Sequence, residues 1–552
     1  MDVPGSAAEL LLTGGRLWSP GGVPSGADSV AVAGGRIVAV GQARELRRLA
    51  GPSARTIDLA GRLLLPGFGD AHAHPIMGGL DRLRCDLSEI DEEAGAYVRA
   101  IAAYAAAHPA RTWIVGGGWS MAAFPEGRPA RKLLDAATPD RPVLIHSRDG
   151  HSAWANSAAL RTAGIDHGTA DPPRGRIERD ADGEPQGTLQ ESATDLVARH
   201  APPASAAERE EALLSGQAYL HGLGITSWNE AIVDPESQAA YVALEGRGAL
   251  TGRASLSLRW DEERGPEQLA ELIERRAAIR AMGSPRLRAE NVKIFQDGVM
   301  ESRTAALLEP YQGPDGKAID EAGTSIHPPE CLREVVTGLE AKGFAVHAHA
   351  IGDRAVREVL DAMEAAAASN GRRNARHHIA HIQLIDPVDI PRFATLGVVA
   401  NAQPLWAAED SYLRDLTRPI VGDERTDRMY PFESLRRAGA RLAIGSDWNV
   451  STADPLALLE VAVRRIDPAR PDDPPFGPAE RLSIEAALEA YTAGSAFVNG
   501  FDLEVGTLEA ARAADLAVID GDILSGSSRS TEATVVLTVA GGRIVHEDPR
   551  LG

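Results

Sequence analysis

Residues 63–74 read Leu63-Leu64-Leu65-Pro66-Gly67-Phe68-Gly69-Asp70-Ala71-His72-Ala73-His74, an apolar run that ends in two histidines. An apolar run bounded by Pro and Gly indicates a buried β-strand. Side chains alternate along a strand, so His72 and His74 point to the same side. Two imidazoles on one side of a strand end favour a divalent metal site, although the motif alone also fits structural histidines.

Seven further β-like runs follow, and most are separated by helical patterns such as residues 328–342 and 355–368. Strands that alternate with helices indicate parallel βαβ units, and eight of them predict an α/β fold, a (β/α)8 barrel of the TIM type. The active site of such a barrel lies at the C-terminal ends of its strands. The eight predicted strands cover residues 63–72, 225–229, 254–260, 292–297, 345–349, 378–382, 398–403 and 442–447.

The interval between the first and second predicted strands is far longer than one crossover needs. We therefore expect residues 81–199 to form an inserted α/β subdomain over the barrel mouth. Within it, residues 171–187 are rich in Pro and Gly and predict a loop or ribbon rather than a helix.

A short repeat links the two ends of the chain. Residues 32–38 read Val-Ala-Gly-Gly-Arg-Ile-Val, and residues 539–545 repeat these seven letters. Apolar residues around Gly-Gly predict tight hairpins, because both turn positions need positive φ. Two unrelated hairpins would also explain the repeated motif. We expect a composite β-sandwich from residues 1–65 plus 496–552, and a metal-binding barrel from residues 66–80 plus 200–495.

Candidate metal ligands recur on the other predicted strands: His349 ends the fifth, His381 lies on the sixth and Asp447 ends the eighth. A carboxylate at a buried strand end is costly unless it is paired or metal-bound. Lys293 lies in the apolar fourth strand, where a lysine ordinarily pairs with an acid such as Asp297. Its neutral amine could instead take up CO2 and become a bridging carbamate. Together these ligands converge on one barrel mouth.

The sequence resembles the metal-dependent amidohydrolase superfamily, in its YtcJ-like branch, which includes N-substituted formamide deformylases. The resemblance covers nearly the whole chain. It is carried by the motifs Pro66-Gly67-Phe68-Gly69-Asp70-Ala71-His72-Ala73-His74-Pro75, Arg148-Asp149-Gly150-His151, Val292-Lys293-Ile294-Phe295-Gln296-Asp297-Gly298, Ser302-Arg303-Thr304-Ala305-Ala306, His349-Ala350-Ile351-Gly352-Asp353-Arg354-Ala355 and Gly445-Ser446-Asp447-Trp448.

The resemblance implies a terminal β-sandwich, a (β/α)8 barrel and two divalent ions, expected to be zinc, that share a carbamate and a hydroxide. The family pattern places its sixth-strand histidine two residues before Gln383, which favours His381 over His378 as a ligand. The implied ligands are His72, His74, carboxylated Lys293, His349, His381 and Asp447.

The mechanism implied for this site is attack of metal-activated hydroxide on an amide carbonyl. Asp447 would act as general base and then as general acid. His151 would stabilise the oxyanion, or else make a structural hydrogen bond.

The sequence departs from the family pattern at Ala380, Asn449 and Ser120, none of which is a presumed ligand. Because they lie near the expected barrel mouth, these departures affect which substrate is expected rather than which class of reaction.

Substrate contacts are expected from Trp119, Arg303, Trp406 and Trp448. The tryptophans would suit an apolar or aryl-bearing substrate, or would pack the insert against the barrel. Arg303 would bind a polar end of the substrate, or pair with Glu301 or Asp297.

Composition limits the remaining possibilities. The 57 Lys and Arg against 78 Asp and Glu give a net charge of −21, which argues against nucleic acid and anionic membranes as partners. Two cysteines, the absence of a signal-like N-terminus and the absence of a long apolar run favour a cytoplasmic protein. The superfamily often forms dimers, so a homodimer is possible.

The expected reaction is hydrolysis of a linear C–N amide bond in a small molecule, such as an N-substituted formamide, an acylamine or a carbamate. Hydrolysis of a cyclic amide, or deamination, by the same site is one alternative. A non-catalytic metal- or ligand-binding protein is another, which the filled ligand positions disfavour.

Overall fold

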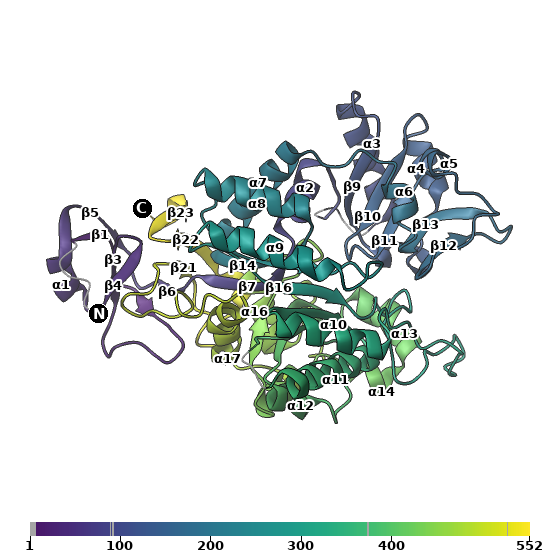
Figure 1. Ribbon diagram of the computed structural model, residues 1–552. Helices are drawn as coiled ribbons and strands as arrows, with labels where there is room; N and C mark the ends of the chain where they lie inside the picture. The colour runs from purple at the N-terminus through teal and green to yellow at the C-terminus, as the bar shows by residue number, and fades with distance from the viewer. Residues whose placement is uncertain (1–6, 89, 91–92, 372–374, 527, 552) are drawn as a thin grey trace.

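The computed structural model describes residues 7–88, 90, 93–371, 375–526 and 528–551. Its centre is a sheet of eight parallel strands in the order β20-β19-β18-β17-β16-β15-β14-β7 (Figure 1). The strands are β7 (Phe68–Ala73), β14 (Ile225–Val233), β15 (Arg253–Arg259), β16 (Leu287–Phe295), β17 (Ala345–Ala350), β18 (His378–His381), β19 (Val399–Ala402) and β20 (Leu442–Ile444).

Backbone hydrogen bonds join the two ends of this sheet. Asp447 N donates to His72 O at 2.7 Å, and His74 N donates to Trp448 O at 2.5 Å. The segment after β20 is thereby tied to the end of β7. The predicted (β/α)8 barrel is confirmed.

The predicted first strand, residues 63–72, is in fact two strands in different sheets. β6 (Leu63–Pro66) pairs with β21 (Leu516–Asp520), whereas β7 pairs with β14 in the barrel. The change occurs at Gly67, where a Cβ atom would lie 2.4 Å from Thr226 Oγ1. Both strands are fully buried, so hydropathy gives no sign of the division.

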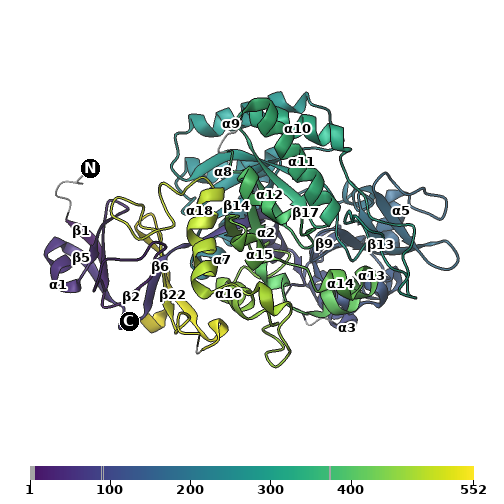
Figure 2. The same cartoon turned by 90° about the horizontal axis from the view of Figure 1, so that it is seen from below.

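Helices surround the barrel, as Figures 1 and 2 show. The helices that follow its strands are α2 (Pro75–Leu83), α7 (Ala206–Gly222), α8 (Pro235–Gly246), α9 (Gln268–Ala281), α10 (Pro329–Ala341), α11 (Asp353–Asn370), α12 (Ile390–Leu396), α15 (Phe432–Arg437), α16 (Pro455–Arg464), α17 (Ile484–Glu489) and α18 (Ser495–Val498). Two short helices, α13 (Arg418–Val421) and α14 (Asp423–Thr426), follow a π-helical turn at Tyr412–Thr417.

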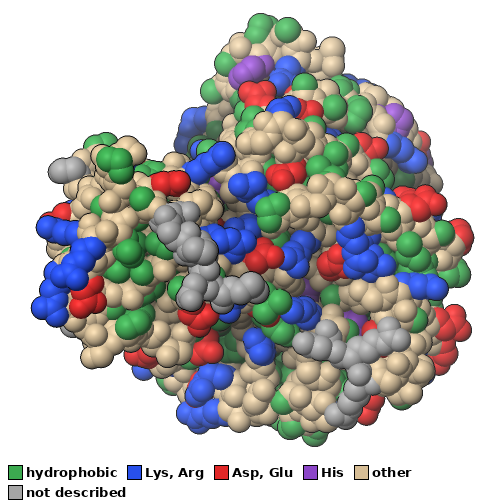
Figure 3. Space-filling view, turned by 60° about the vertical axis from the view of Figure 1, so that its left-hand side comes forward, with side chains coloured by type: hydrophobic (Ala, Val, Ile, Leu, Met, Phe, Trp, Pro, Cys, Tyr) green, Lys and Arg blue, Asp and Glu red, His purple; other side chains and the backbone are tan. Residues whose placement is uncertain are grey.

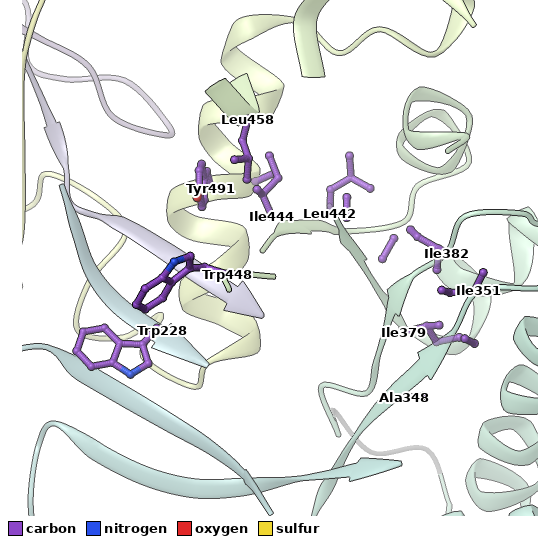
Figure 4. Packing of buried hydrophobic residues seen from close by; sticks show 14 of the residues in the cluster. Trp228, Ala348, Ile351, Ile379, Ile382, Leu442, Ile444, Trp448, Leu458 and Tyr491 are labelled. Atoms are coloured by element: carbon purple, nitrogen blue, oxygen red, sulfur yellow. The ribbon is translucent and has the colours of Figure 1, made fainter. Parts of the chain in front are cut away.

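The largest hydrophobic core lies between these strands and helices. Ile379 of β18, Ile444 of β20 and Leu458 of α16 belong to it (Figure 4). On β17, Val346 and Ala348 also belong to this core, while His347 and His349 alternate with them. Because side chains alternate along β17, its apolar residues face the outer core and its histidines face the barrel interior.

Two further sheets face each other beside the barrel. One has the order β4-β3-β1-β5, and the other, β2-β6-β21-β22-β23, combines strands from both ends of the chain. They share one apolar core, which contains Leu12, Val32, Val518 and Val539. The remaining strands are β1 (Ala8–Thr13), β2 (Arg16–Leu17), β3 (Ser29–Ala33), β4 (Arg36–Gly41), β5 (Ala50–Asp58), β22 (Thr534–Ala540) and β23 (Arg543–Glu547), with a short helix α1 (Ala43–Leu46).

The repeated Gly-Gly turns lie against each other. Gly35 and Gly542 have φ values of 75° and 77°, and a Cβ on Gly542 would lie 2.6 Å from Gly35 Cα. Only glycine combines this backbone conformation with so close an approach. The two copies of the repeat therefore pack against each other at their Gly-Gly turns.

The residues between β7 and α7 form a sheet of their own with the order β12-β13-β11-β10-β9-β8. Its β12/β13 pair is antiparallel and overlaps the stretch 171–187 predicted to be a loop or ribbon, with β13 continuing to Glu191. The elements are β8 (Cys85–Asp86), α3 (Ala94–Ala107), β9 (Ile114–Trp119), α4 (Arg131–Ala137), β10 (Val143–Ser147), β11 (Ser152–Ala155), α5 (Ser157–Ala163), β12 (Gly175–Arg179), β13 (Pro185–Glu191) and α6 (Asp195–Ala198).

The molecular surface carries both signs of charge. On the face shown in Figure 3, acidic and basic side chains are interspersed. Within the described residues, no helix combines the length and the apolar character needed to cross a membrane.

Candidate metal centre

Three histidines and one carboxylate meet at the C-terminal ends of the barrel strands. Asp447 Oδ1 lies 3.3 Å from His72 Nε2 and 3.1 Å from His74 Nε2. Asp447 Oδ2 lies 3.9 Å from His381 Nδ1. All four side chains are buried. The first, sixth and eighth strands therefore deliver their predicted ligands to one point.

Two of these residues have strained backbones. His381 has a φ of 76° and Asp447 a φ of 56°, in the left-handed region that residues other than glycine rarely adopt. Such strain persists where surrounding contacts hold the chain in place. Here Gln403 Oε1 accepts a hydrogen bond from His381 N at 2.8 Å, and His72 O accepts one from Asp447 N.

The donor atoms suit a divalent cation. One ligand atom from each of His72, His381 and Asp447 lies within 4.8 Å of the others. The buried Nδ1 atom of His381 has no hydrogen-bond partner among the described residues. An unpaired nitrogen atom in a buried site is costly, and a metal ion would satisfy it.

The protonation states of these side chains also favour metal binding. Burial lowers the pKa of His72, His349 and His381 well below the usual value, so all three present neutral imidazoles. Burial alone would raise the pKa of Asp447, but the neighbouring His72 and His74 hold it well below its usual range. Neutral imidazole and ionised carboxylate are the ligand forms of these side chains.

Lys293 lies on β16 and is 1% exposed. Its Nζ makes no ion pair or hydrogen bond within the described part of the chain, and it lies 4.8 Å from the centroid of the Phe295 ring. Burial lowers the Lys293 pKa to about 7. The ordinary alternative, a Lys293–Asp297 ion pair, does not form.

Asp297 has other partners. Its carboxylate accepts backbone hydrogen bonds from Ala306, Ile351 and Gly352 at 2.8 to 3.0 Å. Its Oδ1 also lies 3.2 Å from His349 Nδ1. Asp297 thus holds the loop after β17 beside the ring of His349.

A chain of buried polar groups supports His72 from the barrel interior. His72 Nδ1 lies 2.8 Å from His347 Nε2, and His347 Nδ1 lies 2.9 Å from Ser257 Oγ. Ser257 Oγ in turn donates to Asn229 Oδ1 at 2.7 Å. Contacts of this kind orient a metal-binding imidazole. The chain crosses four strands, so sequence spacing gave no sign of it.

His151 reaches the centre from the inserted sheet. Its ring centroid lies 5.6 Å from that of His349, and its Nδ1 lies 2.9 Å from Glu191 Oε2. Burial opposes protonation of His151, but the Glu191 carboxylate outweighs this effect and raises the His151 pKa to about 9. A protonated imidazole therefore faces the group of neutral histidines.

The four residues expected to bind substrate separate into two groups. Trp406 lies flat on His381, with centroids 5.5 Å apart and planes at 12°, and it lines the central cavity. Arg303 also lines the cavity, with Nη1 3.5 Å from Glu321 rather than near Glu301 or Asp297.

The other two residues lie away from the cavity. Trp119 is fully buried in the core of the insert, where it packs on Phe124 and donates to Ile145 O at 2.8 Å. Trp448 packs on Tyr219, with centroids 4.7 Å apart. Neither is among the residues that line the cavity.

The cavity has a volume of about 1460 Å³ and extends between the barrel mouth and the insert. Its lining includes Phe295 beside His349, Trp406 beside His381, and also Leu405 and Tyr430. The same lining contains many arginine and acidic residues from both the barrel and the insert. The lining of the cavity is thus mixed rather than mainly apolar.

Comparison with known proteins agrees with this architecture. The amidohydrolase family matches residues 55–546. Protein LONG AFTER FAR-RED 3 of Arabidopsis thaliana is 30% identical over 98% of this chain and 92% of its own length. The putative amidohydrolase YtcJ of Bacillus subtilis is 30% identical over 94% of this chain and 96% of its own. N-substituted formamide deformylase of Arthrobacter pascens is 28% identical over 94% and 95%.

Among solved structures, an uncharacterized metal-dependent hydrolase of Pyrococcus furiosus is 26% identical and aligns with a TM-score of 0.69. The alignment covers 93% of this chain and 99% of that one. The family match over most of the chain confirms the resemblance seen in the sequence. The protein belongs to the amidohydrolase family.

Proposed function

We propose that this protein is a metal-dependent hydrolase that cleaves the linear C–N amide bond of a small molecule, of the N-substituted formamide, acylamine or carbamate type. The observation that carries the proposal is the position of Asp447. Its carboxylate contacts His72 and His74, lies 3.9 Å from His381 and is among the groups that line the cavity.

The residues that would hold metal are His72, His74, His349, His381, Asp447 and a carboxylated Lys293, with two zinc ions per chain. Lys293 supports this assignment because its buried amine has no ionic partner, and only a neutral amine reacts with CO2. Bound metal would lower the pKa of a water molecule and polarise the substrate carbonyl.

The protein's own groups move the protons. Asp447 takes a proton from the attacking water as its oxygen bonds to the carbonyl carbon. Asp447 then gives this proton to the nitrogen as the C–N bond breaks, so that an amine and a carboxylic acid leave, or, for a carbamate, an amine and a carbonic acid monoester. His151, which lines the cavity beside His349, donates a hydrogen bond to the carbonyl oxygen as negative charge develops there.

The apolar residues that line the cavity indicate which kind of substituent the substrate would carry. The flat face of Trp406, together with Phe295 and Leu405, offers an apolar surface next to the ligands. An apolar or aryl substituent would bury its surface there. N-substituted formamide deformylase, a relative along almost the whole chain, is named for a formamide that carries a substituent on its nitrogen.

The test is a substrate panel with zinc-reconstituted protein: formanilide, N-alkylformamides, acetanilide, a phenylcarbamate, a cyclic imide and an aminopurine. Release of amine from the linear amides is the expected result. Asp447→Asn, with metal content measured, should lower kcat by about 10²- to 10⁴-fold, while Asp522→Asn on the surface should not. Turnover of the cyclic imide or aminopurine alone, or near-normal activity of the metal-loaded Asp447→Asn variant, would overturn the proposal.

A further inference from the structure

The inserted sheet brings two polar residues to the barrel mouth at neighbouring strand ends. His151 directly precedes β11 and Glu191 ends β13, and these strands are antiparallel neighbours. Glu191 N donates to His151 O at 2.8 Å, and Glu191 Oε2 lies 2.9 Å from His151 Nδ1. Backbone and side chain together fix the imidazole relative to the carboxylate.

The barrel holds the same carboxylate from its other side. Thr304 Oγ1, in the loop after β16, donates to Glu191 Oε1 at 2.7 Å. Gly298 in this loop leaves room for the contact, because a Cβ there would lie 2.5 Å from Glu191 Oε1 and 2.2 Å from Thr304 Oγ1. Both oxygen atoms of Glu191 are therefore engaged, one by the insert and one by the barrel.

Glu191 adopts this arrangement at a conformational cost. Its φ is 50°, in the left-handed region, where a side chain is disfavoured. Strained residues cluster at functional sites, where the surrounding contacts maintain them. The three hydrogen bonds described above are such contacts.

The opposite edge of the His151 ring faces the cavity. His151 lines the cavity beside His349, and its Nε2 makes no hydrogen bond to any described residue. Since Nδ1 is directed at the carboxylate, Nε2 is the atom available to a substrate bound over the metal ligands.

We propose that Glu191 is a positioning residue for the amide hydrolysis proposed above. It holds the His151 ring so that Nε2 donates to the substrate carbonyl oxygen, and Thr304 secures Glu191 from the barrel. The insert is then a part of the active site, since it supplies both the donor and the group that orients it. This inference rests on the proposed function for its reaction, but the His151–Glu191–Thr304 contact can be tested separately.

The kinetic test is a double-mutant cycle on zinc-loaded protein with formanilide, or with whichever panel amide turns over. Glu191→Gln should lower kcat by roughly 10- to 100-fold, as loss of an orienting partner does, with KM changed much less. In the His151→Gln background the same substitution should have no further effect, because Glu191 acts only through His151. Equal losses in both backgrounds would overturn the proposal, as would full activity of Glu191→Gln.

Two controls keep this test specific. Glu178→Gln removes another buried carboxylate, on β12 of the same sheet, whose partners are Arg128 and Arg176. It should leave kcat and KM unchanged. Thr304→Ser keeps the hydroxyl that contacts Glu191 and should retain kcat, whereas Thr304→Val should lower it; equal kcat in these two variants would contradict the role of Thr304.

A spectroscopic readout is independent of turnover. A ring N–H held by a buried carboxylate gives a far-downfield proton resonance, so metal-free protein should show one for His151. The signal should persist in Glu178→Gln and vanish in both Glu191→Ala and His151→Gln. A signal that survives in Glu191→Ala, or none assignable to His151, would overturn the positioning role. If no amide is hydrolysed but the signal behaves as expected, the proposed function fails while the His151–Glu191 contact stands.

Discussion

Glu230→Gln should make the protein more stable at neutral pH. Glu230 on β14 is 1% exposed, and its Oε2 accepts hydrogen bonds from Tyr241 OH at 2.8 Å and Ile76 N at 3.3 Å. Burial raises the Glu230 pKa from 4.5 to about 8. The folded protein therefore keeps a proton on Glu230 that the unfolded chain has released. An amide keeps the same shape, can accept both hydrogen bonds and has no proton to lose.

The magnitude follows from the difference between the two pKa values. Between pH 4.5 and 8 the folded state binds one more proton than the unfolded state, so stability falls as pH rises. At about 1.4 kcal/mol per pKa unit, the raised pKa costs about 1 kcal/mol at pH 5 and about 3 kcal/mol at pH 7. The glutamine variant should gain these amounts relative to the wild type, and the gain should plateau above the folded pKa of about 8.

Scanning calorimetry of metal-free protein at pH 5, 6, 7 and 8 measures this effect. At about 1 °C per kcal/mol for a chain of 552 residues, the Tm of the variant should exceed that of the wild type by about 1 °C at pH 5 and about 3 °C at pH 7. Glu274→Gln, an exposed glutamate on α9, serves as the control and should show no pH-dependent difference. A Tm difference that does not change with pH, or a variant less stable than the wild type at pH 7, would refute the reasoning.

Three further substitutions test other parts of the structure. Trp406→Leu should raise KM for formanilide several-fold more than for N-methylformamide, because it removes the aromatic surface beside His381. Trp119→Phe should leave both KM values unchanged but lower the unfolding free energy by about 1 kcal/mol or more, measured in urea, since it leaves a buried carbonyl without its donor. Gly542→Ala should cost about 1 to 3 kcal/mol of stability by the same measurement, because its φ is 77° and its Cβ would lie 2.6 Å from Gly35 Cα; an unchanged urea midpoint would contradict the role given to this turn.

The barrel and the positions of its histidines could be predicted because both follow from local patterns. Parallel strands with C-terminal ends at one mouth bring His72, His381 and Asp447 together whatever the loops between them do. The division of the first strand at Gly67 could not be predicted in this way. Both halves are apolar and buried, and only the partners on either side, β21 and β14, distinguish them.

Local sequence patterns also do not reveal which residues lie around the site. Trp119 and Trp406 are equally apolar in sequence, yet one fills the core of the insert and the other lies on His381. Glu191 carries no signal of its own, because its side-chain contacts are with His151, 40 positions away, and with Thr304, 113 positions away. Contacts of this kind depend on how the insert and the barrel pack, which hydropathy and spacing do not encode.

The proposed reaction would require both parts of the protein. The barrel supplies neutral imidazoles and an ionised carboxylate, which are ligands and proton acceptors. Those groups cannot donate a charge-assisted hydrogen bond to a carbonyl oxygen. The only described histidine beside them whose pKa is raised is His151, and its charge comes from Glu191 in the same insert. If the proposed reaction holds, truncating the insert would leave a metal site without its donor, so the insert could not be exchanged between relatives without exchanging the loop around Thr304 as well.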